Sequence, residues 1–326
     1  MTEPSWPSPH VSDRRYPLNE LDGGRRRSVI VRAPQHTGID AGRFFPYGNP
    51  ADLPPDQRAE DGRSVTFSKG ALGAAVEVLG HPRVRLRLGA GAEGNVIVRL
   101  CDLAPDGSST LVTRGCLNLA RRAGMDRSVP ALAAGETVEV AMSAIAWVFP
   151  PGHRIRLSVS DAYWPWVWPR PYGDEPLVLE PADSELILPV RDPGAPSEPV
   201  RFEPAEQASP LAVVTEVCAA EPEREVRYFP QNNEWQLVAN PNYAGTIVFP
   251  DGLRKSERAR ETYSIRSDDP LCARAFLADG HSSVAGDEWR GRPRPGNPRR
   301  PRSVTAGWPG TAPRYWRSCT RWTHPS

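Results

Sequence analysis

Serine and histidine, the residues of nucleophilic hydrolysis, are present in this chain, but their spacing forms no catalytic motif. A serine hydrolase on an α/β scaffold exposes its nucleophile in a Gly-x-Ser-x-Gly turn between a strand and a helix. No such pentapeptide occurs in the 326 residues. None of the histidines stands in the setting of a triad: His10, His36, His81, His153, His281 and His324. We therefore predict no catalytic residue, and for His153, in the turn "PPGHR", we expect a turn-stabilising or solvent-facing role.

The stretch "ADLPPDQRAEDGRS", residues 51–64, gathers carboxylates and guanidinium groups. The charged residues in it are Asp52, Asp56, Arg58, Glu60, Asp61 and Arg63. Carboxylates that come close together bind a cation or a substrate amine, whereas arginine–carboxylate pairs tie down a long loop. Because Arg58 and Arg63 are interspersed among the carboxylates and the spacing is not that of a metal site, the sequence favours the second interpretation.

The stretch "SDAYWPWVWP", residues 160–169, is dense in aromatic side chains. If it is extended, Trp164, Trp166 and Trp168 share one face of the chain. Three tryptophans bury on the order of 600 Å² together, which is a large area to leave in water. We predict that they are buried, partly in a core and partly against another domain. A platform on which sugar rings stack is the alternative.

Composition and charge exclude several classes of partner. The net charge is +1, so there is no overall electrostatic case for nucleic acid. Mean hydropathy is −0.49, and no apolar run approaches the roughly 20 residues of a membrane helix. The N-terminal residues also lack the pattern of a signal peptide. We expect no membrane partner.

The cysteines are five in number and widely spaced: Cys101, Cys116, Cys218, Cys272 and Cys319. An odd number without a disulfide framework indicates reduced thiols and a cytoplasmic protein. No Cys-x-x-Cys or Cys/His cluster has metal-ligand spacing. With no phosphate-binding or dinucleotide-binding motif either, we expect no cofactor and no metal.

Short alternating runs, separated by Pro/Gly turns, dominate the first 192 residues. In "VRLRL", Val84, Leu86 and Leu88 share one face while arginines occupy the other, which is typical of a strand with one buried side. The runs predicted as strands are 27–33, 84–90, 95–102, 109–120, 136–142, 153–160 and 184–190. This pattern predicts an all-β, antiparallel sandwich, either a jelly roll or an immunoglobulin-like form.

The composition and the hydrophobic pattern of the sequence change after residue 192. We predict a jelly-roll β-sandwich over 1–192, a Pro-rich linker over 193–210 and a small β extension over 211–288. The strands expected in that extension are 211–217, 224–230, 234–239, 245–250, 262–266 and 271–277. Residues 289–326 lack acidic side chains and periodicity, and we expect a disordered tail that arises from a frameshift. An arginine-rich binder of nucleic acid is the competing interpretation of this tail.

Four stretches, in this order and spacing, carry a resemblance to a known family. They are "HTGIDAGRFFPYGNPADLPPDQRAEDGRSVTF", "VRLCDLAPDGSSTLVTRGCLNLARR", "FPPGHRIRLSVSDAYWPWVWPRP" and "ETYSIRSDDPLCARA". Together they resemble the C-terminal region of the cocaine esterase and X-Pro dipeptidyl-peptidase family of serine hydrolases, over roughly residues 5 to 285. The resemblance implies a galactose-binding-like jelly roll that follows an α/β-hydrolase domain. We expect the chain to begin at that jelly roll.

The resemblance also implies how such a chain works. The catalytic Ser, Asp and His of the family belong to the hydrolase domain, so no catalytic residue carries over and the chain alone is expected to be inactive. Its implied partner is an α/β-hydrolase domain, in cis or in trans, and a homo-oligomer is left open. The jelly roll would give structural support and part of the wall of the acyl pocket.

Candidate residues for that wall or interface are Phe44, Phe45 and Tyr47, within "GIDAGRFFPYG". Trp164, Trp166 and Trp168 are candidates for the same surface. Aromatic faces on a glycine-flanked loop suit an apolar pocket, although ordinary packing of these rings is the simpler interpretation. The alternative function is a free-standing carbohydrate-binding module that uses the tryptophans.

Overall fold

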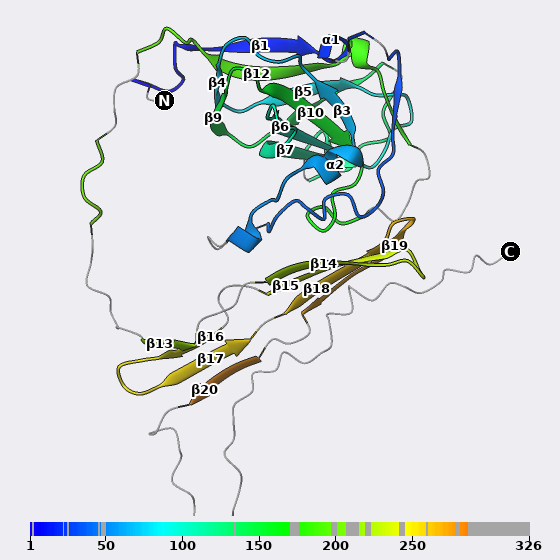
Figure 1. Ribbon diagram of the computed structural model, residues 1–326. Helices are drawn as coiled ribbons and strands as arrows, with labels where there is room; N and C mark the ends of the chain where they lie inside the picture. The colour runs from blue at the N-terminus through cyan, green and yellow to red at the C-terminus, as the bar shows by residue number, and fades with distance from the viewer. Residues whose placement is uncertain are drawn as a thin grey trace, which may run out of the picture. The chain divides into compact units, whose positions relative to one another are not determined.

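The alternating runs of the sequence form antiparallel strands in the structure, a computed structural model (Figure 1). The structure describes residues 1, 3–21, 23–24, 26–44, 46, 50–124, 126–133, 135–169, 176–196, 201–206, 215–218, 223–240, 245–258, 260–277 and 281–285. The chain divides into two units. The first unit comprises Met1–Phe44 and Pro54–Glu203, and the second comprises Phe45–Leu53 and Pro204–Ser326.

The larger sheet of the first unit has six strands. Its order is β8 (Thr137–Ala141), β5 (Arg83–Arg87), β12 (Glu185–Arg191), β4 (Val76–Gly80) and β9 (Ile145–Phe149), with β1 (Val11–Pro17) also paired to β12. Every pairing is antiparallel. Because β12 bonds to β1 on one side and to β4 and β5 on the other, it is the central strand of this sheet.

The second sheet of the first unit has four strands, in the order β3 (Val65–Ser68), β10 (Arg154–Ser160), β6 (Asn95–Leu103) and β7 (Ser109–Asn118). A separate pair joins β2 (Val29–Val31) to β11 (Leu177–Leu179). The helices of this unit are short: α1 (Leu18–Leu21), α2 (Arg58–Gly62) and the 3-10 turns η2 (Leu119–Arg121) and η3 (Pro181–Asp183). A third such turn, η1 (Pro50–Asp52), belongs to the second unit.

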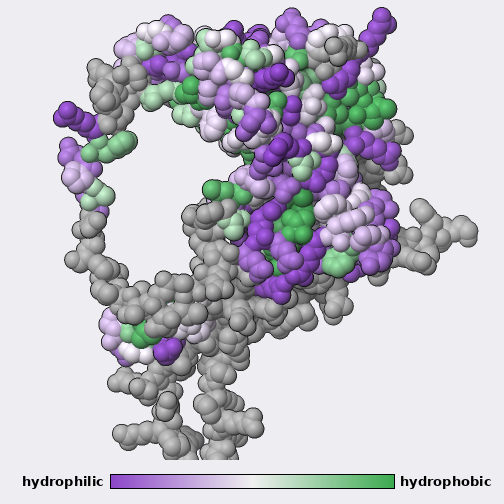
Figure 2. Space-filling model, in the orientation of Figure 1, coloured by the Kyte–Doolittle hydropathy of each residue, from purple (hydrophilic) through white to green (hydrophobic). Residues whose placement is uncertain are grey.

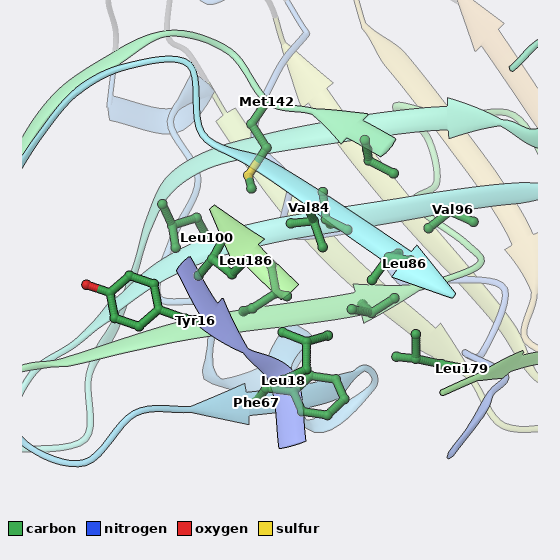
Figure 3. Close-up of a cluster of buried hydrophobic side chains, with 14 of the residues drawn as sticks. Tyr16, Leu18, Phe67, Val84, Leu86, Val96, Leu100, Met142, Leu179 and Leu186 are labelled. Carbon is green, nitrogen blue, oxygen red and sulfur yellow. The ribbon is translucent and has the colours of Figure 1, made fainter. Parts of the chain in front are cut away.

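The main hydrophobic core contains side chains of both sheets, as Figure 3 shows for part of it. Val84 and Leu86 on β5 are fully buried, whereas Arg85 between them is exposed. This is the two-residue period expected of a strand with one face toward a core. Phe67, Val98 and Leu157 contribute the core face of the four-stranded sheet.

Strand β6 is unusual because both of its faces are buried. Val96, Val98 and Leu100 belong to the main core. Ile97 and Arg99 alternate with them, so they lie on the opposite face, and they are as completely buried. The outer face of this sheet is therefore covered by another part of the chain, and that covering holds the candidate site.

The second unit holds two four-stranded antiparallel sheets. One has the order β13 (Thr215–Cys218), β16 (Gly245–Val248), β17 (Arg254–Arg258) and β20 (His281–Ala285). The other has the order β14 (Glu223–Phe229), β15 (Glu234–Asn240), β18 (Glu261–Arg266) and β19 (Asp269–Leu277). Asn233 adopts a φ of 53° in the turn between β14 and β15, a conformation that asparagine tolerates better than most residues.

The prediction of an all-β antiparallel sandwich is confirmed. Each predicted run overlaps a strand, but the local pattern did not predict β1, β3, β4, β9, β11, β17 and β20. Strand β1 escaped it because four successive positions, from Ser12 to Arg15, are polar and exposed, and only Tyr16 is buried. The predicted boundaries at residues 192, 210 and 288 stay predictions, and the proposed tail, 289–326, lies outside the described residues.

Hydrophilic residues dominate the face shown in Figure 2, with apolar residues in separate patches. In the described part of the chain, no helix has the length and apolar character of a membrane span. The described residues likewise contain no group of three or more His, Cys, Asp or Glu side chains placed to hold a metal ion.

Candidate functional site

A buried carboxylate on α2 organises the outer face of the four-stranded sheet. Asp61 Oδ1 accepts hydrogen bonds from Arg99 Nη2 at 3.1 Å and from Ser158 Oγ at 2.8 Å. Its Oδ2 accepts from Ser109 Oγ at 2.8 Å and from Arg156 Nη1 at 2.9 Å. These five residues, here called the Asp61 network, connect α2 to β6, β7 and β10. All lone pairs of the carboxylate are thus engaged by protein donors.

The Asp61–Arg99 pair is shielded from water, with side chains 5% and 1% exposed. Desolvation raises the pKa of Asp61, but the charge of Arg99 and hydrogen bonds from Arg156, Ser109 and Ser158 outweigh it, so the pKa lies below its usual value. The carboxylate is therefore charged at neutral pH and serves as the counter-ion of a buried arginine.

Glu60, the residue before Asp61, is a second buried carboxylate that holds another segment of the chain in place. Its buried carboxylate accepts hydrogen bonds from the backbone N–H groups of Gly38 at 2.8 Å and Asp40 at 2.9 Å. Arg63 bridges it to Asp40, with Nη2 3.0 Å from the Asp40 carboxylate. The charged stretch around residues 51–64 thus contains a loop tied by arginine–carboxylate pairs, the interpretation that the sequence favoured.

The loop held by Glu60 comes very close to the aromatic stretch. Gly38 has a φ of +100°, and a Cβ there would lie 2.4 Å from the carbonyl carbon of Tyr163. Next to it, the backbone N–H of Trp164 donates to the carbonyl of Thr37 at 2.7 Å. Only glycine permits both this φ and this contact, so Gly38 fixes where the aromatic stretch lies.

The aromatic stretch is a turn and not an extended strand. Tyr163 pairs with Val167 across it, and the N–H of Val167 donates to the Tyr163 carbonyl at 2.7 Å. The condition under which three tryptophans would share one face, an extended chain, is therefore not met. Trp164 is fully buried, whereas Trp168 is 38% exposed.

Trp166 is the tryptophan that connects to the predicted pocket wall. Its Nε1 donates to the carbonyl of Gly42 at 2.8 Å, and its ring meets Phe44 edge-on, with centroids 4.9 Å apart. The Phe44 side chain is 73% exposed. Phe44 and Trp166 thus lie together, while Phe45 and Tyr47 lie outside the described residues.

Arg114 on β7 completes this cluster and was not singled out from the sequence. Its guanidinium carbon lies 3.5 Å from the Trp166 ring centroid. Its Nη1 donates to the Ala41 carbonyl at 2.6 Å and to the Tyr163 hydroxyl at 2.8 Å. Desolvation raises the pKa of Tyr163 to about 12, so this hydroxyl stays neutral. We call Phe44, Arg114 and Trp166 the Arg114 cluster.

His153 makes one contact that resembles part of a triad. Its Nδ1 lies 2.8 Å from Asp102 Oδ1, and Trp147 Nε1 donates to the other oxygen of the same carboxylate at 3.2 Å. No described serine or cysteine hydrogen-bonds to His153. The pair joins the β9, β6 and β10 regions, and it fits the turn-stabilising role expected from the sequence.

Acid is expected to destabilise the first unit through His36. This residue is 7% exposed, and burial, followed by the charge of Arg63, lowers its pKa to about 4. An unfolded histidine titrates at about 6.5, so between these values the unfolded state binds more protons than the folded state. Stability therefore rises with pH in this interval. We expect the free energy of unfolding to fall by roughly 2–3 kcal/mol from about pH 7 to about pH 4.

Urea titrations at a series of pH values, followed by tryptophan fluorescence, measure this slope. The His36→Asn variant, whatever its stability at pH 7, is expected to lose most of the slope between about pH 6.5 and about pH 4.5. Asp61 adds a further loss at lower pH, since its pKa is also depressed. An unchanged slope in His36→Asn would show that another group is responsible.

These features define a class of protein: an all-β unit with a packed core, an outer face tied by ion pairs and hydrogen bonds, and no assembled catalytic group among its described residues. Comparison with protein families then identifies it. Residues 1–197 match the model of the X-Pro dipeptidyl-peptidase C-terminal non-catalytic domain. The chain belongs to this family.

Two curated relatives come from Mycobacterium bovis and Mycobacterium tuberculosis and are named provisionally as serine esterases. Each is 28% identical to this chain over 127 aligned residues, which cover 33% of this chain and 20% of the relative. The chain thus matches about a fifth of the length of these relatives.

Three solved structures of hydrolases match part of this chain. An α-amino acid ester hydrolase is 19% identical, with a TM-score of 0.40 over 58% of this chain and 34% of its own. An aminopeptidase from a marine sediment Thaumarchaeota archaeon is 16% identical, with a TM-score of 0.41 over 58% and 37%. A CocE/NonD family hydrolase from Staphylococcus aureus is 12% identical, with a TM-score of 0.39 over 59% and 38%.

Proposed function

We propose that this chain is the non-catalytic C-terminal part of a serine hydrolase that resembles X-Pro dipeptidyl-peptidases and acyl esterases. Its partner in this proposal is an α/β-hydrolase domain, in cis or in trans, which supplies the Ser, Asp and His of the reaction. The family membership of residues 1–197 supports the non-catalytic role. Ester or peptide hydrolysis is then an activity of the assembled protein.

The observation that carries the proposal is the exposed position of Phe44 on a rigid support. Its ring contacts Trp166, which is held by the Gly42 carbonyl and by Arg114. Below this layer the Asp61 network connects α2 to the sheet. A large apolar side chain that is 73% exposed and well supported suits an interface with a second domain, including the wall of an acyl pocket.

The experiment that tests the non-catalytic role uses the chain by itself. Purified protein is assayed with p-nitrophenyl butyrate and Ala-Pro-p-nitroanilide and is treated with a fluorophosphonate that labels activated serines. We expect no turnover above the buffer rate and no labelling, because no hydrogen bond joins a serine hydroxyl to the His153 ring among the described residues. Labelling of one serine, abolished by its replacement with alanine, would contradict the proposal.

The carbohydrate-binding alternative has weaker support. Trp164 is buried, and Arg114 covers one face of Trp166, so neither ring offers the open platform that a sugar requires. Trp168 is the exposed tryptophan of this stretch. A glycan-binding screen with a Trp168→Ala control tests the alternative, and saturable binding that this substitution abolishes would favour it over the hydrolase role.

A further inference from the structure

Arg114 is a cation held in place without an ionic partner among the described residues. Its Nη1 bonds two neutral oxygens, the Ala41 carbonyl and the Tyr163 hydroxyl. No carboxylate in the described part of the chain forms an ion pair with it. Its remaining donors, Nε and Nη2, make no hydrogen bond to a described residue and are not sealed from solvent. These two atoms form one edge of the guanidinium plane.

The neighbouring strand makes this arrangement unusual. Arg114 on β7 is directly paired with Arg99 on β6, and like charges at paired positions repel each other. Arg99 has a counter-ion in Asp61, at 3.1 Å. Arg114 has no counter-ion among the residues that the structure describes, so an anion placed at its open edge would compensate its charge.

Other groups near Arg114 do not supply that anion. Cys116 follows two positions later on the same strand and therefore faces the same side. Although the residue is exposed overall, desolvation raises the pKa of its thiol to about 11, against the effect of Arg114. The thiol is thus neutral at physiological pH and leaves the charge of Arg114 uncompensated.

We propose that the Arg114 cluster is a binding site for a small carboxylate that carries an aromatic or other flat apolar group. The Nε/Nη2 edge offers the two parallel N–H donors that match a carboxylate. Trp166 holds the guanidinium plane by stacking, which lowers the entropy cost of binding. Phe44 contacts the same indole and presents an exposed ring beside it for the apolar group.

The carboxylate site shares Phe44 and Trp166 with the proposed interface but requires no second domain. The hydrolase role requires a second domain, whereas the carboxylate site is formed by residues of the first unit alone. The two proposals are tested by different measurements, hydrolysis and serine labelling for one and carboxylate binding for the other, so a failure of one is distinguishable from a failure of the other.

The probe is phenylacetate, titrated into the full chain while the indole N–H resonance of Trp166 is followed by NMR. A Trp166→Phe sample assigns the resonance. We expect saturable shifts with a Kd on the order of millimolar, as suits one exposed bidentate pair with a small apolar contact. Phenylacetamide has the same shape without the charge, and we expect it to bind at least about tenfold more weakly.

Variants test each part of the site. Arg114→Gln is expected to abolish the saturable shift. Arg114→Lys is expected to weaken phenylacetate binding, because lysine keeps the charge but lacks the two parallel N–H donors of the guanidinium group. Phe44 is exposed, so Phe44→Ala should fold normally; it is expected to weaken phenylacetate severalfold and to leave acetate unchanged. Arg58→Gln, at an arginine whose side chain is 65% exposed, is the matched control and should bind as the parent does.

Three results would overturn the proposal. The first is the absence of saturation in the parent protein up to roughly 50 mM phenylacetate, well above the expected Kd. The second is equal binding of phenylacetamide. The third is unchanged binding in a folded Arg114→Gln variant; if that variant does not fold, an unchanged affinity of Phe44→Ala for phenylacetate decides against the site.

Discussion

Replacement of Asp61 by alanine is expected to destabilise the first unit by about 3–5 kcal/mol, since it leaves Arg99 buried without a counter-ion. The same change removes acceptors from Arg156, Ser109 and Ser158, which lie on strands β10 and β7. The loss is therefore larger than that of a surface ion pair. Urea unfolding at pH 7, followed by tryptophan fluorescence, measures it.

Asp56→Ala is the matched control for this experiment. Asp56 also pairs with an arginine, Arg58, but those side chains are 35% and 65% exposed. Exposed pairs contribute little, so we expect a change within about 0.5 kcal/mol. Equal effects of the two substitutions would mean that the Asp61 network does not support the outer face as described.

Replacement of Gly38 by alanine is the second large effect, at about 3 kcal/mol or more. The added Cβ would lie 2.4 Å from the carbonyl carbon of Tyr163, and the φ of +100° is one that alanine rarely adopts. The loop or the aromatic turn must move to relieve this contact. Because Tyr163 holds Arg114, we also expect phenylacetate binding to be lost.

Gly73→Ala is the control here. A Cβ at Gly73 would meet no atom within 4 Å, and its φ is not in the left-handed region. We expect a stability change within about 0.5 kcal/mol, in either direction, and unaltered ligand binding. If Gly38→Ala were as harmless as Gly73→Ala, the close approach of the two segments would not exist in solution.

Local pattern was sufficient to predict the fold class. Val84 and Leu86 alternate with arginines, and this alone indicates a strand with one buried face. The polar strand β1 was not predicted, because its residues do not alternate. Its pairing with β12, more than 160 residues away, cannot be recognised from a local pattern. Periodicity left open whether the sandwich is a jelly roll or an immunoglobulin-like form. The family resemblance, carried by four stretches, implied the jelly roll.

The candidate site was predicted only in part. The aromatic stretch and Phe44 were identified from residue type, but the turn at Tyr163–Val167 separates tryptophans that an extended chain would have aligned. Arg114 gave no local signal, because its role depends on contacts with Ala41, Tyr163 and Trp166, distant in sequence. Local sequence patterns do not show which distant residues meet.

The charged stretch illustrates the same limit. Its mixture of arginines and carboxylates indicated a structural loop, yet nothing in residues 51–64 distinguishes buried Asp61 from exposed Asp56. The difference arises from partners on the sheet, Arg99 and Arg156, that lie well downstream.

The most direct test of the central claim is complementation of a catalytic domain. The segment that matches this chain is deleted from the Mycobacterium bovis relative, and this chain is supplied in trans or fused in its place. We expect a complex on size-exclusion chromatography and recovered hydrolysis of p-nitrophenyl butyrate, with Phe44→Ala lowering kcat/KM by about tenfold and Arg58→Ala having no effect. A truncated relative that is as active without this chain, and that forms no complex with it, would contradict the account.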